Sequence, residues 1–409
     1  MVGWSALMVA ATAPGQTAAV SVFIDPMIAD LGVSRAAIST AYLIGTLTGA
    51  VAMPFVGRML DRFGVRLVMA GIGVVFSAAL CSLAAVSSIV GLTAGFVVIR
   101  MAGQGALGLV ATTAVALWFD RRRGTAVGLV SAVGASAISL APVLLETLVS
   151  DWGWRRTWLA EGIAIAVLVL PVALLAMRNR PADLGQQPDG KAANQTRPPR
   201  EIWGVPRAIA LRTPFFWVVT GGIAATGLLS TAINFHQISL LTARGLSTVE
   251  AAANFLPQTV ANLLGTLLTG MLADRLRSQW LIAASMTCLL AALLLGTVVL
   301  PGVLAIVFGL LLGTAGGSIR ALEAATFPRH FGTRHLGAIR GMVTSVSVGS
   351  TAFGPLLFAG LYQATGSYTP ALLVAVPIPL AVAIAALCIR PPRFGKESHE
   401  PERSGSATG

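Results

Sequence analysis

Two charged side chains lie one helical turn apart inside an apolar stretch. Arg320 and Glu323 belong to the run GGSIRALEAATF. A guanidinium can hold a carboxylate through two parallel hydrogen bonds. A carboxylate three residues away on a helix can neutralise that guanidinium or exchange a proton. We therefore hypothesise that Arg320 binds an anion and Glu323 carries a proton. The alternative is that Arg320 only pairs with Glu323, or extends to water near Arg329, about 14 Å along the helix.

Other polar residues stand in neighbouring apolar runs. Asn234 and His236 lie in the run NFHQ, while Gln258 and Asn262 are one turn apart in the next run. We interpret all four as substrate ligands, with His236 also a candidate for proton coupling. The competing interpretations are a buried core histidine and polar contacts that join helices. Arg100 stands in a separate apolar run, where one interpretation is a structural hydrogen-bond donor.

These residues require a scaffold that lies in lipid. Hydrophobic residues make up 55% of the chain and charged residues 11%, whereas soluble proteins carry about a quarter charged residues. A spanning helix needs about 20 apolar residues. Twelve runs qualify, near residues 3–25, 35–57, 66–88, 91–117, 124–148, 157–177, 214–240, 249–271, 279–300, 302–326, 337–361 and 369–390. The predicted fold is an all-α integral membrane protein with twelve transmembrane helices.

The basic residues predict the orientation of these spans. Of the 28 Lys and Arg residues, 22 fall on the side that holds both termini, and only Arg35, Arg155, Arg156 and Arg244 fall on the other. By the positive-inside rule, both termini are cytoplasmic. The net charge of +12 then reflects topology, and no nucleic-acid partner is expected because the charges form no basic stripe.

An internal repeat divides the chain. Three motifs recur at an offset of 213 residues, pairing Gly32 with Gly245, Gly57 with Gly270 and Gly124 with Gly337. The repeat predicts two six-helix bundles, at residues 1–177 and 214–390. A cytoplasmic linker at 178–213, rich in proline, glycine and charge, and a polar tail at 391–409 complete the predicted organisation.

A loop motif follows the second predicted span and recurs after the eighth. Its first copy contains Gly57, Asp61, Arg62, Gly64 and Arg66, and its second contains Gly270, Asp274 and Arg275. The motif resembles the signature of the major facilitator superfamily of secondary transporters. The resemblance implies two pseudo-symmetric bundles around one central cavity, and transport by alternating access. The motif residues are then expected to form a conformational latch.

The stretch RMAGQGALG contains a formal GxGxxG, but it lies within a span and follows no strand. A dinucleotide site is therefore not predicted. The stretch resembles a helix 4 motif of the same superfamily, whose arginine, here Arg100, is tied to proton coupling in some members. Cys81, Cys288 and Cys388 lie in separate runs without metal spacing. We expect no cofactor, no metal site and, without a nucleophile and base arrangement, no enzymatic activity.

Short stretches such as RPADLGQQPDG and HFGTRHLGAIRG resemble the bacterial monocarboxylate and oxalate/formate-type branch. That branch implies a histidine on helix 7 and an asparagine on helix 8, which His236 and Asn262 match. It also implies an arginine four residues later, where this chain has Thr266. We predict transport of a small organic anion, such as a carboxylate, across a bacterial cytoplasmic membrane, with Arg320 as the relocated anchor. Coupling to protons is a hypothesis.

Two other functions stay open from the sequence. A proton-coupled efflux pump for cationic or amphipathic compounds would use a carboxylate that faces the cavity, and Glu323 is the candidate. A membrane sensor could share the fold and signal without moving solute, although it would normally need a partner-binding domain.

Overall fold

The structure is a computed structural model that describes residues 1–119, 123–179, 181, 204–273, 275–332, 336–392 and 394. The regular elements of this part of the chain are helices. The N-terminal half contains α1 (Val2–Ala10), η1 (Ala13–Gly15), α2 (Thr17–Leu31), α3 (Arg35–Leu83), α4 (Ile89–Ile99), η2 (Arg100–Leu107), α5 (Gly108–Trp118), α6 (Arg123–Trp152), α7 (Trp154–Pro171) and η3 (Val172–Ala176). The C-terminal half contains α8 (Arg207–Leu211), α9 (Pro214–Thr242), α10 (Thr248–Ala253), α11 (Phe255–Ala273), α12 (Ser278–Gly296), α13 (Val303–Phe331), α14 (Leu336–Thr365), α15 (Thr369–Ala375) and α16 (Pro377–Cys388).

Twelve helical segments of the described chain are long and apolar enough to cross a membrane. They confirm the predicted all-helical fold with twelve spans. The element α3 contains two of these spans, Arg35–Met53 and Arg62–Leu83, and Gly64, with φ 77° and ψ 172°, interrupts the helix near the start of the second. A positive φ favours glycine because a side chain would be strained there. The space is also filled, since a Cβ on Gly64 would lie 2.6 Å from Asn179 Oδ1.

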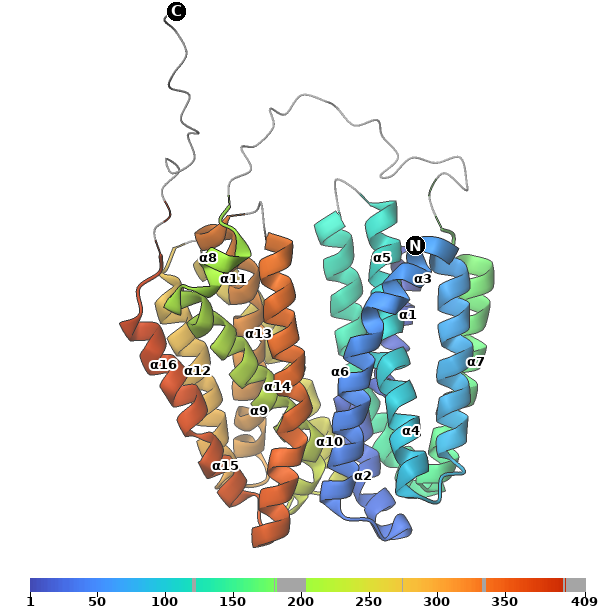
Figure 1. Cartoon of the computed structure of the whole chain (residues 1–409). Helices are drawn as coiled ribbons and strands as arrows, with labels where there is room; N and C mark the ends of the chain where they lie inside the picture. Colours follow the sequence, from blue (N-terminus) through green and yellow to red (C-terminus); the bar gives the residue numbers. More distant parts are fainter. Residues whose placement is uncertain are drawn as a thin grey trace, which may run out of the picture.

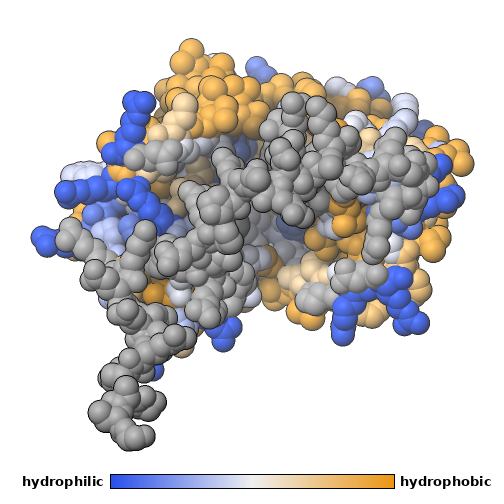
Figure 2. Space-filling model, turned by 90° about the horizontal axis from the view of Figure 1, so that it is seen from above, coloured by the Kyte–Doolittle hydropathy of each residue, from blue (hydrophilic) through white to orange (hydrophobic). Residues whose placement is uncertain are grey.

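The helices form two groups, one from each half of the chain (Figure 1). The N-terminus and the C-terminal end of α16 lie at the same end of the molecule, which we call the terminal end; the opposite end is the far end. Large apolar side chains such as Val51, Val167 and Leu175 are exposed, as expected for surfaces that contact lipid. Seen from the terminal end, hydrophobic residues occupy much of the flanks and hydrophilic residues lie at the rim (Figure 2).

The first span is broken near its middle. Pro14 and Gly15 belong to the short element η1, and Gln16 has an extended backbone, with φ −86° and ψ 151°. The helix resumes as α2 at Thr17. A Cβ on Gly15 would lie 2.6 Å from the Ile99 carbonyl oxygen, so glycine is needed for this close approach to the fourth span. The break places Gln16 and Thr17 within the membrane-spanning part of the bundle.

Glycines spaced four residues apart allow α13 to pack closely on α11. A Cβ on Gly313 would lie 2.0 Å from the Gln258 carbonyl oxygen, and a Cβ on Gly317 would lie 2.0 Å from that of Asn262. Small residues at this spacing are typical of tightly packed membrane helices. The packing brings Arg320, less than one turn beyond Gly317, beside α11.

A cluster of polar and aromatic residues joins the two halves toward the far end. Asp25 on α2 forms an ion pair with Arg35 on α3, and both side chains hydrogen-bond the hydroxyl of Ser239 on α9. The Arg35 guanidinium also lies 5.3 Å from the centroid of the Tyr362 ring on α14. We call these four residues the far-end cluster. Because it links the N-terminal half to two helices of the C-terminal half, it holds the far ends together.

Candidate functional site

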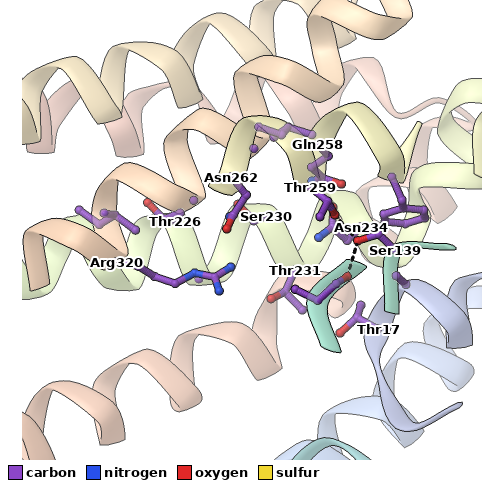
Figure 3. A pocket seen from close by; sticks show the side chains of 18 of the residues that line it. Thr17, Ser139, Thr226, Ser230, Thr231, Asn234, Gln258, Thr259, Asn262 and Arg320 are labelled. Atoms are coloured by element: carbon purple, nitrogen blue, oxygen red, sulfur yellow. Dashed lines mark hydrogen bonds between the residues drawn. The ribbon is translucent and has the colours of Figure 1, made fainter. Parts of the chain in front are cut away.

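A cavity of about 520 Å³ lies between the two halves. Helices α2, α6, α9, α11, α13 and α14 contribute its described lining, most of which comes from the C-terminal half. Most of the polar lining residues carry hydroxyl or amide side chains, and several of them converge in Figure 3. Among the lining residues that the structure describes, Arg320 and Glu323 carry the charges. This combination suits a hydrophilic solute with an anionic group.

Arg320 extends from α13 into this cavity (Figure 3). The residue is exposed although it lies well inside the α13 span, because the space that it faces is the cavity. With the Asn262 amide oriented so that its oxygen faces the donors, that oxygen accepts hydrogen bonds of 3.2 Å from Arg320 Nη2 and from the Gly317 N–H. Glu323 lines the same cavity and interacts electrostatically with the guanidinium. The site therefore presents a held guanidinium beside a carboxylate.

Two more of the predicted residues contact each other on the cavity wall. Gln258 on α11 donates from Nε2 to Oδ1 of Asn234 on α9, at 2.9 Å. Both side chains line the cavity together with Asn262. Asn234, Gln258, Asn262, Arg320 and Glu323, which the sequence singled out in three separate runs, thus surround one space.

His236 does not line this cavity. Its side chain is 1% exposed, with Nε2 2.9 Å from the Pro355 carbonyl oxygen and Nδ1 3.4 Å from the Tyr368 hydroxyl. In this arrangement Nε2 donates to Pro355 and Nδ1 accepts from Tyr368. The physical reason is helix rotation, since two positions along a helix turn the side chain by about 200°. Asn234 therefore faces the cavity, while His236 packs against the last helices of its own half.

Arg100 lies behind the cavity wall. Its Nε donates to Thr46 Oγ1 at 3.1 Å and its Nη1 to the Gly15 carbonyl oxygen at 2.9 Å, while the guanidinium lies 4.3 Å from the centroid of the Tyr42 ring. Nη2 has no hydrogen-bond partner within the described part of the chain, and neither ion pair found there includes Arg100. These neutral contacts hold the break in the first span and thereby position Thr17, which lines the cavity.

The first loop motif packs within the N-terminal half. The Arg66 backbone N–H donates to Asn179 Oδ1 at 3.0 Å, and the same amide fills the space beside Gly64. The Arg62 guanidinium lies 5.2 Å from the centroid of the Phe63 ring. These contacts tie the motif, which the structure places within α3 around the break at Gly64, to Asn179 just beyond the sixth span. This copy is therefore joined to a neighbouring segment of its own half.

The remaining motif residues show fewer contacts. A Cβ on Gly57 or Gly270 would meet nothing within 4 Å. Arg275 is exposed just beyond α11. The side chain of Asp61, and the whole of Asp274, lie outside the described residues, so the predicted latch is tested at neither acidic position.

Several residues that line the cavity were not predicted from the sequence. Thr17, Ser139, Thr226, Ser230 and Thr259 all face the cavity, but serine and threonine are common in spanning helices, where they bond their own backbone. Thr226, for example, donates to the Gly222 carbonyl oxygen. By contrast, the glycines spaced four residues apart in GLLLGTAGG are a sequence pattern that indicates a close helix contact, here between α11 and α13. Within the described part of the chain, no three metal-ligating side chains gather.

Comparisons with known proteins agree with this architecture. The family model described as Major Facilitator Superfamily matches residues 6–347 and 247–408. The MFS-type transporter YcxA of Bacillus subtilis (strain 168) is 24% identical over 258 residues, covering 63% of this chain and 60% of YcxA. The oxalate:formate antiporter of Oxalobacter formigenes is 25% identical over 384 residues, 92% and 87% of the two chains. The crystal structure of the nucleoside transporter NupG has a TM-score of 0.75 at 12% identity, covering 95% of this chain and 98% of NupG.

Proposed function

Because the chain belongs to the major facilitator superfamily, we propose that it moves a small organic anion, most simply a carboxylate, by alternating access. Members of this family are multi-pass membrane transporters of small molecules and not enzymes. The anion is our own inference. It is supported by the similarity to the oxalate:formate antiporter of Oxalobacter formigenes and, above all, by Arg320.

Arg320 is the observation on which the anion proposal rests. An arginine near the centre of a bilayer costs about 2.5–3.5 kcal/mol on insertion scales, so such a residue usually has a function and a partner. Here its guanidinium faces the cavity, and Asn262 accepts from one of its nitrogens. A carboxylate in the cavity can accept from the donors that remain, which are fixed in a planar fork.

Charge balance in the cavity supports proton coupling at Glu323. Arg320 and Glu323 together contribute no net charge to the described lining. A monoanion bound to Arg320 would therefore leave one negative charge in a site of low dielectric, which is unfavourable. A proton taken up by Glu323 would restore neutrality. We propose that anion and proton cross together.

The conformation is consistent with a transporter closed at its far end. The far-end cluster joins the two halves there. From the positive-inside rule we infer that the terminal end faces the cytoplasm. We propose that the bundles at residues 1–177 and 214–390 rock about the cavity in a bacterial cytoplasmic membrane. Most of the predicted linker, residues 182–203, lies outside the described residues.

Binding to purified protein tests the proposal directly. Arg320→Gln should weaken binding of a carboxylate by about 10- to 150-fold, because hydrogen bonds to charged groups contribute about 1.5–3 kcal/mol. Arg212→Gln is the matched control, since Arg212 is exposed just before α9. Titration calorimetry against a panel of short carboxylates measures both. Wild-type affinity in Arg320→Gln would remove the anion proposal.

Glu323 also favours a second candidate function, proton-coupled efflux of lipophilic cations. A carboxylate on the cavity wall can attract a cation as well as a proton. If Glu323→Gln abolished binding of tetraphenylphosphonium while Arg320→Gln left it intact, efflux would replace anion transport. If Glu323→Gln instead kept anion binding but lost proton-driven uptake in liposomes, the coupling proposal would hold.

A further inference from the structure

The cavity has two levels of polar side chains. The first, which we call the guanidinium level, contains Arg320 and Asn262, joined at 3.2 Å. The second, the amide level, contains Asn234 and Gln258, joined at 2.9 Å. Gln258 is one helical turn from Asn262 along α11, on the side of the far end. A turn of four residues rises about 6 Å, so the two levels are separated by about that distance.

The amide level is suited to hydroxyl groups. The Gln258–Asn234 hydrogen bond uses one donor and one acceptor, and leaves Gln258 Oε1 as an acceptor and Asn234 Nδ2 as a donor on the cavity wall. A hydroxyl both donates and accepts, so one ligand hydroxyl can satisfy both atoms. Ser230 lies one turn before Asn234 on α9, and its hydroxyl has no hydrogen-bond partner within the described part of the chain.

The described lining provides no cation at the amide level. A second carboxylate placed there would be desolvated without a counter-charge, which is costly. Neutral hydroxyls meet no such penalty. The lining therefore favours a ligand with one acidic end and one hydroxylated end over a dicarboxylate.

The dimensions set the length of this ligand. An extended chain gains roughly 1.2 Å per covalent bond, so about five bonds span the 6 Å between the levels. The cavity volume of about 520 Å³ also lies in the range that accepts ligands much larger than a one- or two-carbon acid. A chain of about six carbons can place its carboxylate at one level and its distal hydroxyls at the other.

We propose that the transported solute is a sugar acid, a polyhydroxylated monocarboxylate of about six carbons. Its carboxylate binds Arg320 and its distal hydroxyls bind Asn234 and Gln258, with Ser230 between the two levels. This assignment rests on the anion transport proposed above and adds the identity of the neutral end.

Three ligands with six-carbon chains test separately how the acidic end and the hydroxylated end of the solute contribute to binding. Gluconate has the acid and the hydroxyls, hexanoate has the acid alone, and sorbitol has the hydroxyls alone. Titration calorimetry on the full-length protein should show gluconate binding at least tenfold more tightly than hexanoate, because it adds two or more neutral hydrogen bonds. Sorbitol should bind more weakly than gluconate by a larger factor, because it lacks the charged group.

Substitutions at Asn234 and Gln258 then test whether the amide level causes the difference in affinity between gluconate and hexanoate. Asn234→Ala and Gln258→Ala should each weaken gluconate binding by about tenfold and leave hexanoate binding unchanged, which shows that the variant is folded. Gln363→Ala, an exposed glutamine at the far end of α14, is the matched control and should change neither affinity.

The outcomes distinguish the sugar-acid proposal from the anion-transport proposal on which it rests. Equal affinity for gluconate and hexanoate would overturn the sugar-acid assignment and leave anion transport standing. An equal loss for both acids in Asn234→Ala and Gln258→Ala would also overturn it, since the amide level would then only support the fold. If neither acid bound, the anion proposal itself would fail.

Discussion

The substitution Gly317→Ala tests whether the packing of α13 on α11 sets the geometry of the anion site. The added Cβ would lie 2.0 Å from the Asn262 carbonyl oxygen and 2.9 Å from the Thr266 nitrogen. Both atoms belong to backbone inside a helix, so neither can move alone. Ordinary contact begins at 3.4 Å, and the helices must therefore separate locally by about 1.4 Å.

That displacement exceeds what the Arg320–Asn262 contact can absorb. The contact is 3.2 Å long, and a hydrogen bond is lost by about 3.6 Å. Overpacking costs about 1–3 kcal/mol, which lowers the melting temperature by about 1–4 °C in a chain of 409 residues, because the entropy of unfolding scales with chain length. Without Asn262 to orient the guanidinium, carboxylate affinity should fall by about tenfold, the effect of one hydrogen bond to a charged group.

Thermal unfolding in detergent and calorimetric titration with a carboxylate measure the two effects. Gly360→Ala is the control, because Gly360 is an exposed glycine on α14 in the same half and a Cβ there would meet nothing within 4 Å. It should be neutral or slightly stabilising, as expected for alanine within a helix. A Gly317→Ala protein with unchanged melting temperature and affinity would refute this account of the helix contact.

Three further substitutions probe other parts of the structure. Ser239→Ala removes a hydroxyl shared by Asp25 and Arg35, so pulse-EPR labels on the far-end loops of the two halves should move apart; an unchanged distance distribution would contradict a closing role. His236→Gln should lower the melting temperature and leave KM unchanged, whereas the reverse result would indicate a ligand. Arg100→Met leaves buried carbonyl and hydroxyl groups unpaired, at about 1–3 kcal/mol each, so thermal stability should fall; a wild-type melting temperature would disprove its structural role.

The polar residues show how far sequence patterns reach. Arg320 and Glu323 stood out because charges inside an apolar span are rare and costly, and both line the cavity. Asn234 and His236 looked equivalent in NFHQ, yet only Asn234 faces that space. The rotation of α9 about its axis, set by packing against its neighbours, decides which of the two side chains faces the cavity. No local sequence pattern indicates that rotation. Ser230 and Thr226 carried no signal, because a single hydroxyl in a spanning helix is commonplace.

The amino-acid sequence by itself determined that this chain forms twelve spanning helices arranged in two related halves. Lipid imposes that outcome residue by residue, since each span needs about 20 apolar residues and must satisfy its own backbone hydrogen bonds. Only the tertiary structure decided which polar atoms share one space. Asn262 meets Arg320 because glycines such as Gly317 let two helices approach until backbone touches backbone, and that distance depends on the packing of both helices at once.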